Sequence, residues 1–202
     1  MNKNEKYSIK KYDSIASEYE KSYDGKFTAR FKQKMLDFCE VTNGDKVLDV
    51  GCGIGTLIHE ISRKAEIKAY GVDISSKMIE VCRQKYKDIG FEVTTGEKLP
   101  FEGNTFDMLT ICCALHHLNN PQNFFIEAYR VLKSGGTLVV GEPLFPLIIR
   151  KLTDWIFSPL IKAGDNKLFS HKRLISLFTD NGFSIINVYK KGVTQIIKAR
   201  KN

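Results

Sequence analysis

The stretch VLDVGCGIGTL, residues 47–57, decides the fold of this 202-residue chain. A short apolar run carries the acid Asp49, glycines follow at positions 51, 53 and 55, and apolar residues then return at helical spacing. Glycine permits a positive φ and lets a ligand lie against the backbone, so three alternate glycines leave a bare turn facing a helix N-terminus. A strand, a bare turn and a helix in this order predict a nucleotide site.

Strand and helix patterns alternate outward from this stretch. Such alternation predicts right-handed βαβ units and a parallel sheet covered on both faces. Two final strands joined only by Lys190, Lys191 and Gly192 predict an antiparallel hairpin. We expect an α/β fold, a doubly wound, seven-stranded, mostly parallel sheet with a C-terminal antiparallel hairpin strand. The predicted strands cover 46–50, 67–73, 91–95, 107–113, 137–142, 183–189 and 193–200, and the predicted helices among them cover 57–65, 76–86, 121–132 and 171–180.

The spacing of the glycines indicates which nucleotide the turn would hold. The dinucleotide fingerprint GxGxxG needs glycine at position 56, where this chain has Thr56. Asp49 would repel a pyrophosphate, but it would help to hold the ammonium group of S-adenosylmethionine. The second predicted strand ends in Asp73, 22 residues after Gly51, close to the spacing at which a carboxylate accepts hydrogen bonds from ribose hydroxyls. Ile74 then offers an apolar face for adenine.

Two later segments carry a family resemblance together with this turn. They are TTGEKLPFEGNTFDMLTICCALHHL, residues 94–118, and EAYRVLKSGGTLVVGEP, residues 127–143. The chain resembles the class I S-adenosylmethionine-dependent methyltransferases, in the small-molecule branch that includes the ubiquinone and menaquinone methyltransferases (methyltransferase type 11-like). The resemblance runs over 12–142, and more loosely over 171–183. It implies a Rossmann-like fold and S-adenosyl-L-methionine as cofactor, bound by Tyr19, Asp49, Gly51, Cys52, Gly53, Asp73, Ile74, Met78, Thr95, Gly96, Glu97 and Cys112.

One position departs from the family pattern. Relatives commonly have Asp-Ala-Glu after the third strand, where the Asp binds the adenine amino group, whereas this chain has Thr95, Gly96 and Glu97. The Thr95 hydroxyl can still accept a hydrogen bond, but the acidic contact is missing. We therefore expect a modest affinity for the cofactor.

Two histidines and two cysteines follow the fourth predicted strand, at the edge of the sheet where ligands bind. His116 and His117 are the candidate catalytic bases, because an imidazole titrates near neutral pH. A role as a helix-start or loop element is the alternative. Cys112 and Cys113 lie in an apolar run, which favours core packing over thiol or metal chemistry.

Residues 1–40 are expected to form lid helices of a single domain that covers 1–202. Their element YDxxAxxY resembles one that lies over the cofactor in the family, and an ordinary core stripe is the alternative. A lid that orders on cofactor binding would exclude water from the site. The element consists of Tyr12, Asp13, Ala16 and Tyr19, and a second amphipathic helix follows with Phe27, Phe31, Met35 and Phe38.

The apolar insertion 143–170, which contains the one Trp, is expected to shape the pocket of an apolar or aromatic acceptor. A core cover, a dimer contact and an interfacial helix on anionic lipid are the alternatives. One side of its predicted helix consists of Leu147, Ile148, Leu152, Trp155 and Ile156.

The formal net charge of +8 is compatible with a nucleic acid, an anionic membrane surface or an acidic small molecule. An RNA methyltransferase is the first alternative function, but CCALHHL, residues 112–118, has neither of the motifs typical of nucleic-acid methyltransferases, Asn/Asp-Pro-Pro-aromatic and Pro-Cys. A non-catalytic S-adenosylmethionine-binding module is the second, and a nicotinamide oxidoreductase comes last. We expect a small-molecule acceptor and no nucleic acid. Peripheral membrane contact stays open, and the sequence does not indicate the oligomeric state.

Five cysteines without a CxxC pair fit neither a disulfide framework nor a zinc site, so we expect reduced core thiols and no metal. The opening MNKNEKYSIKKY lacks the apolar core of a signal peptide, and no run reaches the roughly 18 apolar residues of a spanning helix. We expect a cytoplasmic protein.

Overall fold

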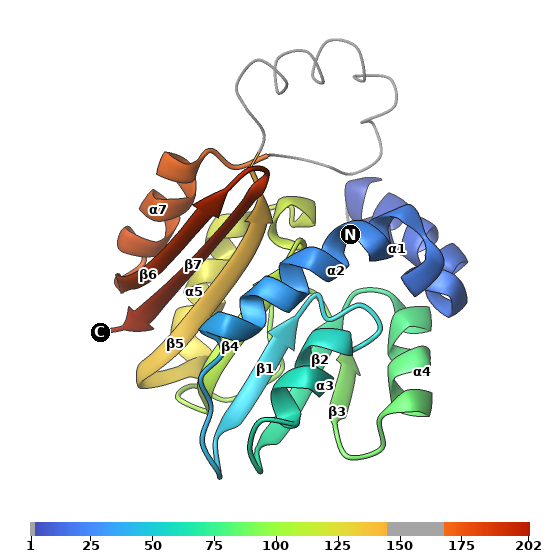
Figure 1. The fold of residues 1–202 in the computed structure, drawn as a ribbon, viewed down its shortest axis with the longest axis horizontal. Helices are drawn as coiled ribbons and strands as arrows, with labels where there is room; N and C mark the ends of the chain where they lie inside the picture. Colours follow the sequence, from blue (N-terminus) through green and yellow to red (C-terminus); the bar gives the residue numbers. More distant parts are fainter. Residues whose placement is uncertain (1–2, 145–167) are drawn as a thin grey trace.

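Seven strands form one mixed sheet in the computed structural model, which describes residues 3–144 and 168–202. They are β1 Lys46–Val50, β2 Lys68–Asp73, β3 Gly90–Val93, β4 Phe106–Cys112, β5 Leu132–Pro143, β6 Phe183–Lys191 and β7 Thr194–Lys201. Their order in the sheet is β3-β2-β1-β4-β5-β7-β6 (Figure 1). The strands β1 to β5 pair in parallel, whereas β7 runs antiparallel to both β5 and β6. The predicted fold class is confirmed, including its C-terminal hairpin.

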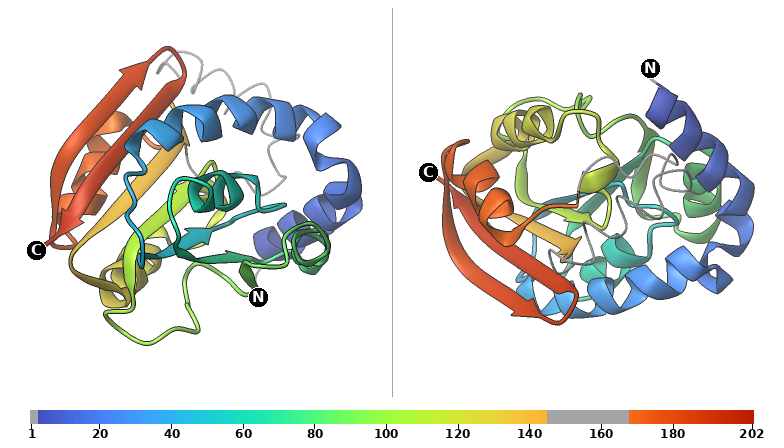
Figure 2. Two further views of the ribbon diagram at one scale, coloured as in Figure 1. Left: turned by 60° about the horizontal axis from the view of Figure 1, so that its bottom comes forward. Right: turned by 90° about the horizontal axis from the view of Figure 1, so that it is seen from above.

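Helices pack on both faces of this sheet (Figures 1 and 2). They are α1 Lys3–Ile15, α2 Tyr23–Met35, α3 Thr56–Ser62, α4 Ser76–Lys85, α5 Pro121–Val131 and α7 His171–Thr179, with shorter 3-10 turns η1 Ala16–Lys21, η2 Leu36–Phe38 and η3 Leu115–His117. On one face α5 and α7 bury apolar side chains such as Phe124 and Phe178. On the other face α2, α3 and α4 do so with Phe31, Ile58 and Ile79. The sheet is therefore apolar on both sides, as a doubly wound fold requires.

Polar side chains fix where the helices begin. The Ser22 hydroxyl accepts a hydrogen bond from Gly25 N at 3.0 Å and caps α2, and the Ser75 hydroxyl accepts one from Met78 N at 3.1 Å and caps α4. Ser170 caps α7 in the same way, as its place before His171 in the sequence predicts.

The N-terminal stripe is less regular than one helix. The helix α1 ends at Ile15, and Glu18 within the following 3-10 turn has non-helical backbone angles. Ala16 and Tyr19 nevertheless pack in one buried cluster with Ile54 of the glycine turn and Met78 of α4. The chain bends so that it can cross the ends of the strands, and the apolar side of the stripe stays inside.

Most of the insertion 143–170 lies outside the described residues. This includes the whole of the expected apolar helix with Trp155, so its acceptor role stays a prediction. Within the described parts of the chain, none of the helices has the length and apolar character needed to cross a membrane.

Candidate functional site

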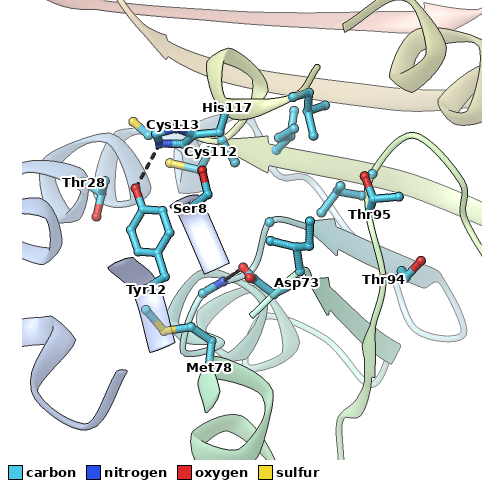
Figure 3. Close-up of a pocket in the computed structure, with 18 of the residues that line it drawn as sticks. Ser8, Tyr12, Thr28, Asp73, Met78, Thr94, Thr95, Cys112, Cys113 and His117 are labelled. Carbon is cyan, nitrogen blue, oxygen red and sulfur yellow. Dashed lines mark hydrogen bonds between the residues drawn. The ribbon is translucent and has the colours of Figure 1, made fainter. Parts of the chain in front are cut away.

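A pocket opens at the carboxyl ends of β1, β2 and β4. At this place the strand order reverses, because β2 lies on one side of β1 and β4 lies on the other. Its empty space is about 860 Å³, counting the part open to solvent. The N-terminal helices form its opposite wall (Figure 3). Asp49, Cys52 and His116 are buried beside it but do not line it. The other predicted residues are brought together in its lining: Tyr19, Gly51, Gly53, Asp73, Ile74, Met78, Thr95, Gly96, Glu97, Cys112 and His117.

The glycine turn presents bare backbone to this pocket. Gly51 and Gly53 have φ values of 65° and 57°, in the left-handed region that favours glycine. A Cβ on Gly51 would lie 2.5 Å from the Cβ of Ala114, whereas a Cβ on Gly53 would have no neighbour within 4 Å. The first glycine therefore permits a close approach of two chain segments, and the second leaves room for a ligand.

Asp73 at the end of β2 is anchored by the backbone. One carboxylate oxygen accepts a hydrogen bond from Gly53 N at 2.8 Å, and the other accepts one from Ser75 N at 2.9 Å. Burial raises the pKa of Asp73, and the hydrogen bonds from the amides of Ser75 and Gly53 oppose this rise. Each oxygen keeps a second lone pair, so the carboxylate can still accept hydrogen bonds from two ligand hydroxyls.

Asp49 lies beneath the turn and is 2% exposed. Its carboxylate accepts a hydrogen bond from the Thr110 hydroxyl of β4 at 2.6 Å. Burial raises the pKa of Asp49 to about 7, so its charge changes near neutral pH. Because Asp49 does not line the pocket, its effect on a bound ammonium group stays a prediction.

The loop after β3 forms a further part of the pocket wall. Glu97 accepts hydrogen bonds from Asn119 N at 2.7 Å and Asn120 N at 3.2 Å, which ties this loop to the segment after β4. The Thr95 hydroxyl accepts one from Glu97 N at 3.3 Å. A Cβ on Gly96 would lie 2.8 Å from a methyl of Val50, so the loop packs closely on β1.

The two histidines point to different partners. His117 lines the pocket, and its Nε2 lies 2.9 Å from the Tyr12 hydroxyl of α1 (Figure 3). His116 is buried, with its Nδ1 2.6 Å from a carboxylate oxygen of Glu142, whose other oxygen accepts a hydrogen bond from Leu115 N at 3.0 Å. His117 is thus the histidine placed to meet a ligand, and His116 helps to hold the turn that carries it.

All five cysteines are buried, which confirms their predicted place in the core. Cys112 and Cys113 line the pocket, and burial raises the pKa of the Cys113 thiol well above its usual range. Burial acts on Cys52 in the same direction. A protonated thiol is a poor nucleophile and metal ligand. In the described part of the chain, no group of three or more His, Cys, Asp or Glu side chains could hold a metal ion.

Five polar residues of the pocket were not predicted as site residues from the sequence: Glu5 and Ser8 of α1, Thr28 and Lys32 of α2, and Thr94 after β3. Ser8 lies four residues before Tyr12, so helical spacing from Tyr12 could have found it. Its hydroxyl is buried and has no hydrogen-bond partner among the described residues. No sequence signal singles out Lys32 from the other lysines of α2.

A sequence family described as a methyltransferase domain matches residues 48–140, which carry the glycine turn, Asp73 and both histidines. The demethylmenaquinone methyltransferase of Thermotoga maritima is 29% identical over 165 residues, which is 80% of this chain and 72% of the relative. Residues 48–140 of this chain therefore form a methyltransferase domain.

Further relatives of this methyltransferase carry similar names. The demethylmenaquinone methyltransferase of Tropheryma whipplei is 35% identical over 117 residues, 56% of this chain and 48% of the relative. The ubiquinone/menaquinone biosynthesis C-methyltransferase of Cronobacter sakazakii is 34% identical over 143 residues, 67% of this chain and 53% of the relative. The chain spans about half the length of these two relatives.

Solved structures support the fold of the methyltransferase. A methyltransferase in complex with the Haloferax volcanii Trm112 activator matches with a TM-score of 0.80 and 18% identity, over 94% of this chain and 96% of that chain. The geranyl diphosphate C-methyltransferase of Streptomyces coelicolor matches with a TM-score of 0.75 and 14% identity, over 86% of this chain and 78% of that chain.

The pocket fits S-adenosylmethionine, the cofactor of this methyltransferase family. Asp73 has acceptor capacity left for ribose hydroxyls, and Ile74 beside it lines the pocket. The space next to Gly53 is open. The loop that carries Thr95 and Gly96 lies where the family resemblance puts the adenine contacts, but it offers a hydroxyl and backbone in place of a carboxylate.

Proposed function

We propose that this chain transfers a methyl group from S-adenosylmethionine to a small apolar or aromatic acceptor. Demethylmenaquinone, which appears in the names of its relatives, belongs to this class of acceptor. The observation that carries the proposal is the continuity of one pocket. It joins Asp73 and Gly53, which suit an adenosyl group, to Tyr12 and His117 on the side of α1.

The lining near His117 supports an acceptor of low polarity. Ile111 and Leu118 border the pocket there, together with the ring of Tyr12, and the rings of Tyr12 and His117 meet edge to face at 5.6 Å. Apolar and aromatic walls with a few placed polar groups are typical of small-molecule sites. The relatives named as quinone methyltransferases favour such an acceptor over RNA.

S-adenosylmethionine supplies an activated methyl group on a sulfonium, so the protein mainly has to align the acceptor and exclude water. The helix α1 and the turn η1 close one side of the pocket with Tyr12 and Tyr19, which supports the predicted role of these segments as a lid.

His117 is the proposed general base for an acceptor that must lose a proton. Its ring faces the pocket, and the Tyr12 hydroxyl at Nε2 can orient it or pass on a proton. Glu142 holds both the His116 ring and Leu115 N, so the turn η3 keeps its position while His117 acts. We assign His116 a positioning role.

Incubation with methyl-labelled S-adenosylmethionine and fractionated cell extract tests the proposal. We expect label in the lipid-soluble or small-molecule fraction, and less of it with the Asp73→Ala variant at the same concentration of S-adenosylmethionine. Label in RNA would overturn the acceptor assignment. Calorimetric titration with S-adenosylhomocysteine and NADH separates the cofactors, and binding of NADH alone would overturn the function itself.

A further inference from the structure

Lys32 of α2 is the cation of the pocket. Among the described residues of the lining it carries the one Lys or Arg side chain. Three carboxylates, those of Glu5, Asp73 and Glu97, line the same pocket. A lone ammonium in such a place either neutralises a neighbouring acid or meets a ligand.

The acids nearest at hand do not pair with it. Lys32 forms no ion pair with any residue in the described part of the chain. Asp73 is bonded to backbone amides, and Glu97 holds the amides of Asn119 and Asn120. The Lys32 ammonium does lie over the ring of Tyr19, 5.6 Å from the ring centre, and this contact leaves its N–H donors available to a ligand.

Lys32 also borders a shallow hollow on the outer side of α2, lined by Glu20 and Glu60. Both of these acids already have partners. Glu20 pairs with Lys85 at 3.3 Å, and Glu60 lies 3.9 Å from Arg63. The outer hollow does not explain Lys32 either.

The helix α2, which carries Lys32, packs against β4 and β5. One turn further along α2, the sulfur of Met35 lies against Gly141 of β5, which is paired with Cys112 at the end of β4. Figure 1 shows α2 crossing these strands. Burial raises the pKa values of Asp49 and Asp73, and the positive charge of Lys32 acts on both in the opposite direction. Lys32 therefore lines the same pocket as the glycine turn, and its charge is felt by both acids at the ends of β1 and β2.

We propose that the Lys32 ammonium is the counter-ion of the carboxylate at the amino-acid end of the methyl donor. The inference rests on the proposed function, since it takes S-adenosylmethionine as the ligand. That end of the ligand carries an ammonium and a carboxylate. The acids around the turn suit the ammonium, and Lys32 is the pocket group of opposite sign for the carboxylate.

Calorimetry on the full chain with two ligands tests this assignment. The first ligand is S-adenosylhomocysteine, and the second is the same thioether with a 3-aminopropyl group in place of its amino-acid end, which removes only the carboxylate. The variants are Lys32→Met, Lys32→Arg and the matched control Lys26→Met, which changes an exposed lysine of the same helix outside the pocket.

We expect Lys32→Met to weaken S-adenosylhomocysteine about 10- to 100-fold, the loss typical of a charged hydrogen bond, and to leave the decarboxylated ligand within about twofold. Lys32→Arg should restore most of the affinity, and Lys26→Met should bind both ligands as the wild type does. Unaltered binding of the decarboxylated ligand also shows that the variant is folded.

Two results overturn the assignment and leave the proposed function standing. They are an unchanged affinity of Lys32→Met for S-adenosylhomocysteine, and an equal loss for both ligands. Failure of the wild-type chain to bind S-adenosylhomocysteine at all would overturn the proposed function and the Lys32 assignment with it.

Discussion

Asp49→Asn should change how the stability of this protein depends on pH. Asp49 is 2% exposed, and burial raises its pKa from 3.8 to about 7. Asn keeps an oxygen that can accept the hydrogen bond from Thr110, and it carries no charge at any pH. The variant therefore removes the titration and keeps the shape of the site.

The sign follows from proton binding. Between pH 3.8 and about 7 the folded state holds a proton on Asp49 and the unfolded state does not, so the free energy of unfolding falls as pH rises through this window. Each pH unit well inside the window is worth about 1.4 kcal/mol, and the slope halves near pH 7 where the group is half ionised, which gives about 2 kcal/mol between pH 5 and pH 7. The Asn variant has no titrating group at this position, so its free energy of unfolding does not fall in this way. The difference in unfolding free energy, variant minus wild type, should thus rise by about 2 kcal/mol from pH 5 to pH 7 and level off by pH 8.

Urea unfolding of both proteins at half-unit steps from pH 5 to pH 8.5 measures this difference, and other titrating groups cancel in it. Asp107→Asn is the matched control. Burial raises the pKa of Asp107, but hydrogen bonds from Lys133 and from Lys46 N outweigh it, and the net shift is downward. Asp107 stays ionised in both the folded and the unfolded state above pH 5. The difference in unfolding free energy between Asp107→Asn and the wild type should therefore not change with pH. A flat difference for Asp49→Asn as well would refute the assignment of a buried, proton-binding carboxyl under the turn.

Three further substitutions test the pocket. Asp73→Ala should weaken S-adenosylhomocysteine by about 1 to 3 kcal/mol in calorimetry through lost ribose hydrogen bonds, and an unchanged affinity would remove Asp73 from the site. Ser8→Ala should raise the free energy of unfolding by about 1 kcal/mol in urea titration, because it removes a buried hydroxyl that has no partner among the described residues; a loss of stability would contradict this. His117→Ala should lower kcat about 10²- to 10⁴-fold for a hydroxyl acceptor while S-adenosylhomocysteine binds as before. An unchanged kcat would exclude His117 as the base.

The glycine turn and the strand ends were predictable because their signals are local. Gly51, Gly53 and Asp73 follow strands whose apolar runs are short and sharply bounded, and the edge rule for parallel sheets brings them together without knowledge of the packing. The bond between Asp49 and Thr110 was not predictable in this way. It depends on the register of β1 against β4, two strands that are 61 residues apart at this pair.

The pocket residues of α1 and α2 are harder to predict than the glycine turn and the strand ends, because tertiary packing decides which of their side chains face the pocket. Nothing in the sequence distinguishes Lys32 from its neighbouring lysines, because the face of α2 that meets the pocket is set by how Phe31 and Met35 pack on the sheet. The bend after Ile15 likewise comes from the path over the strand ends, whereas the apolar spacing alone predicts a continuous helix. The two histidines show the same limit, since only the turn η3 sends His116 to Glu142 and leaves His117 in the pocket.

The charge of the pocket has the opposite sign to the charge of the chain. The whole chain carries +8, yet the lining holds three carboxylates against the single ammonium of Lys32. A negative pocket attracts a ligand with a sulfonium and an ammonium, and it repels a phosphate or an acidic acceptor. Transfer of the methyl group removes the positive charge from sulfur, so the spent cofactor loses part of that attraction. The net positive charge of the chain can therefore serve solubility or a loose contact with an anionic membrane, whereas the charges of the pocket itself favour an uncharged acceptor.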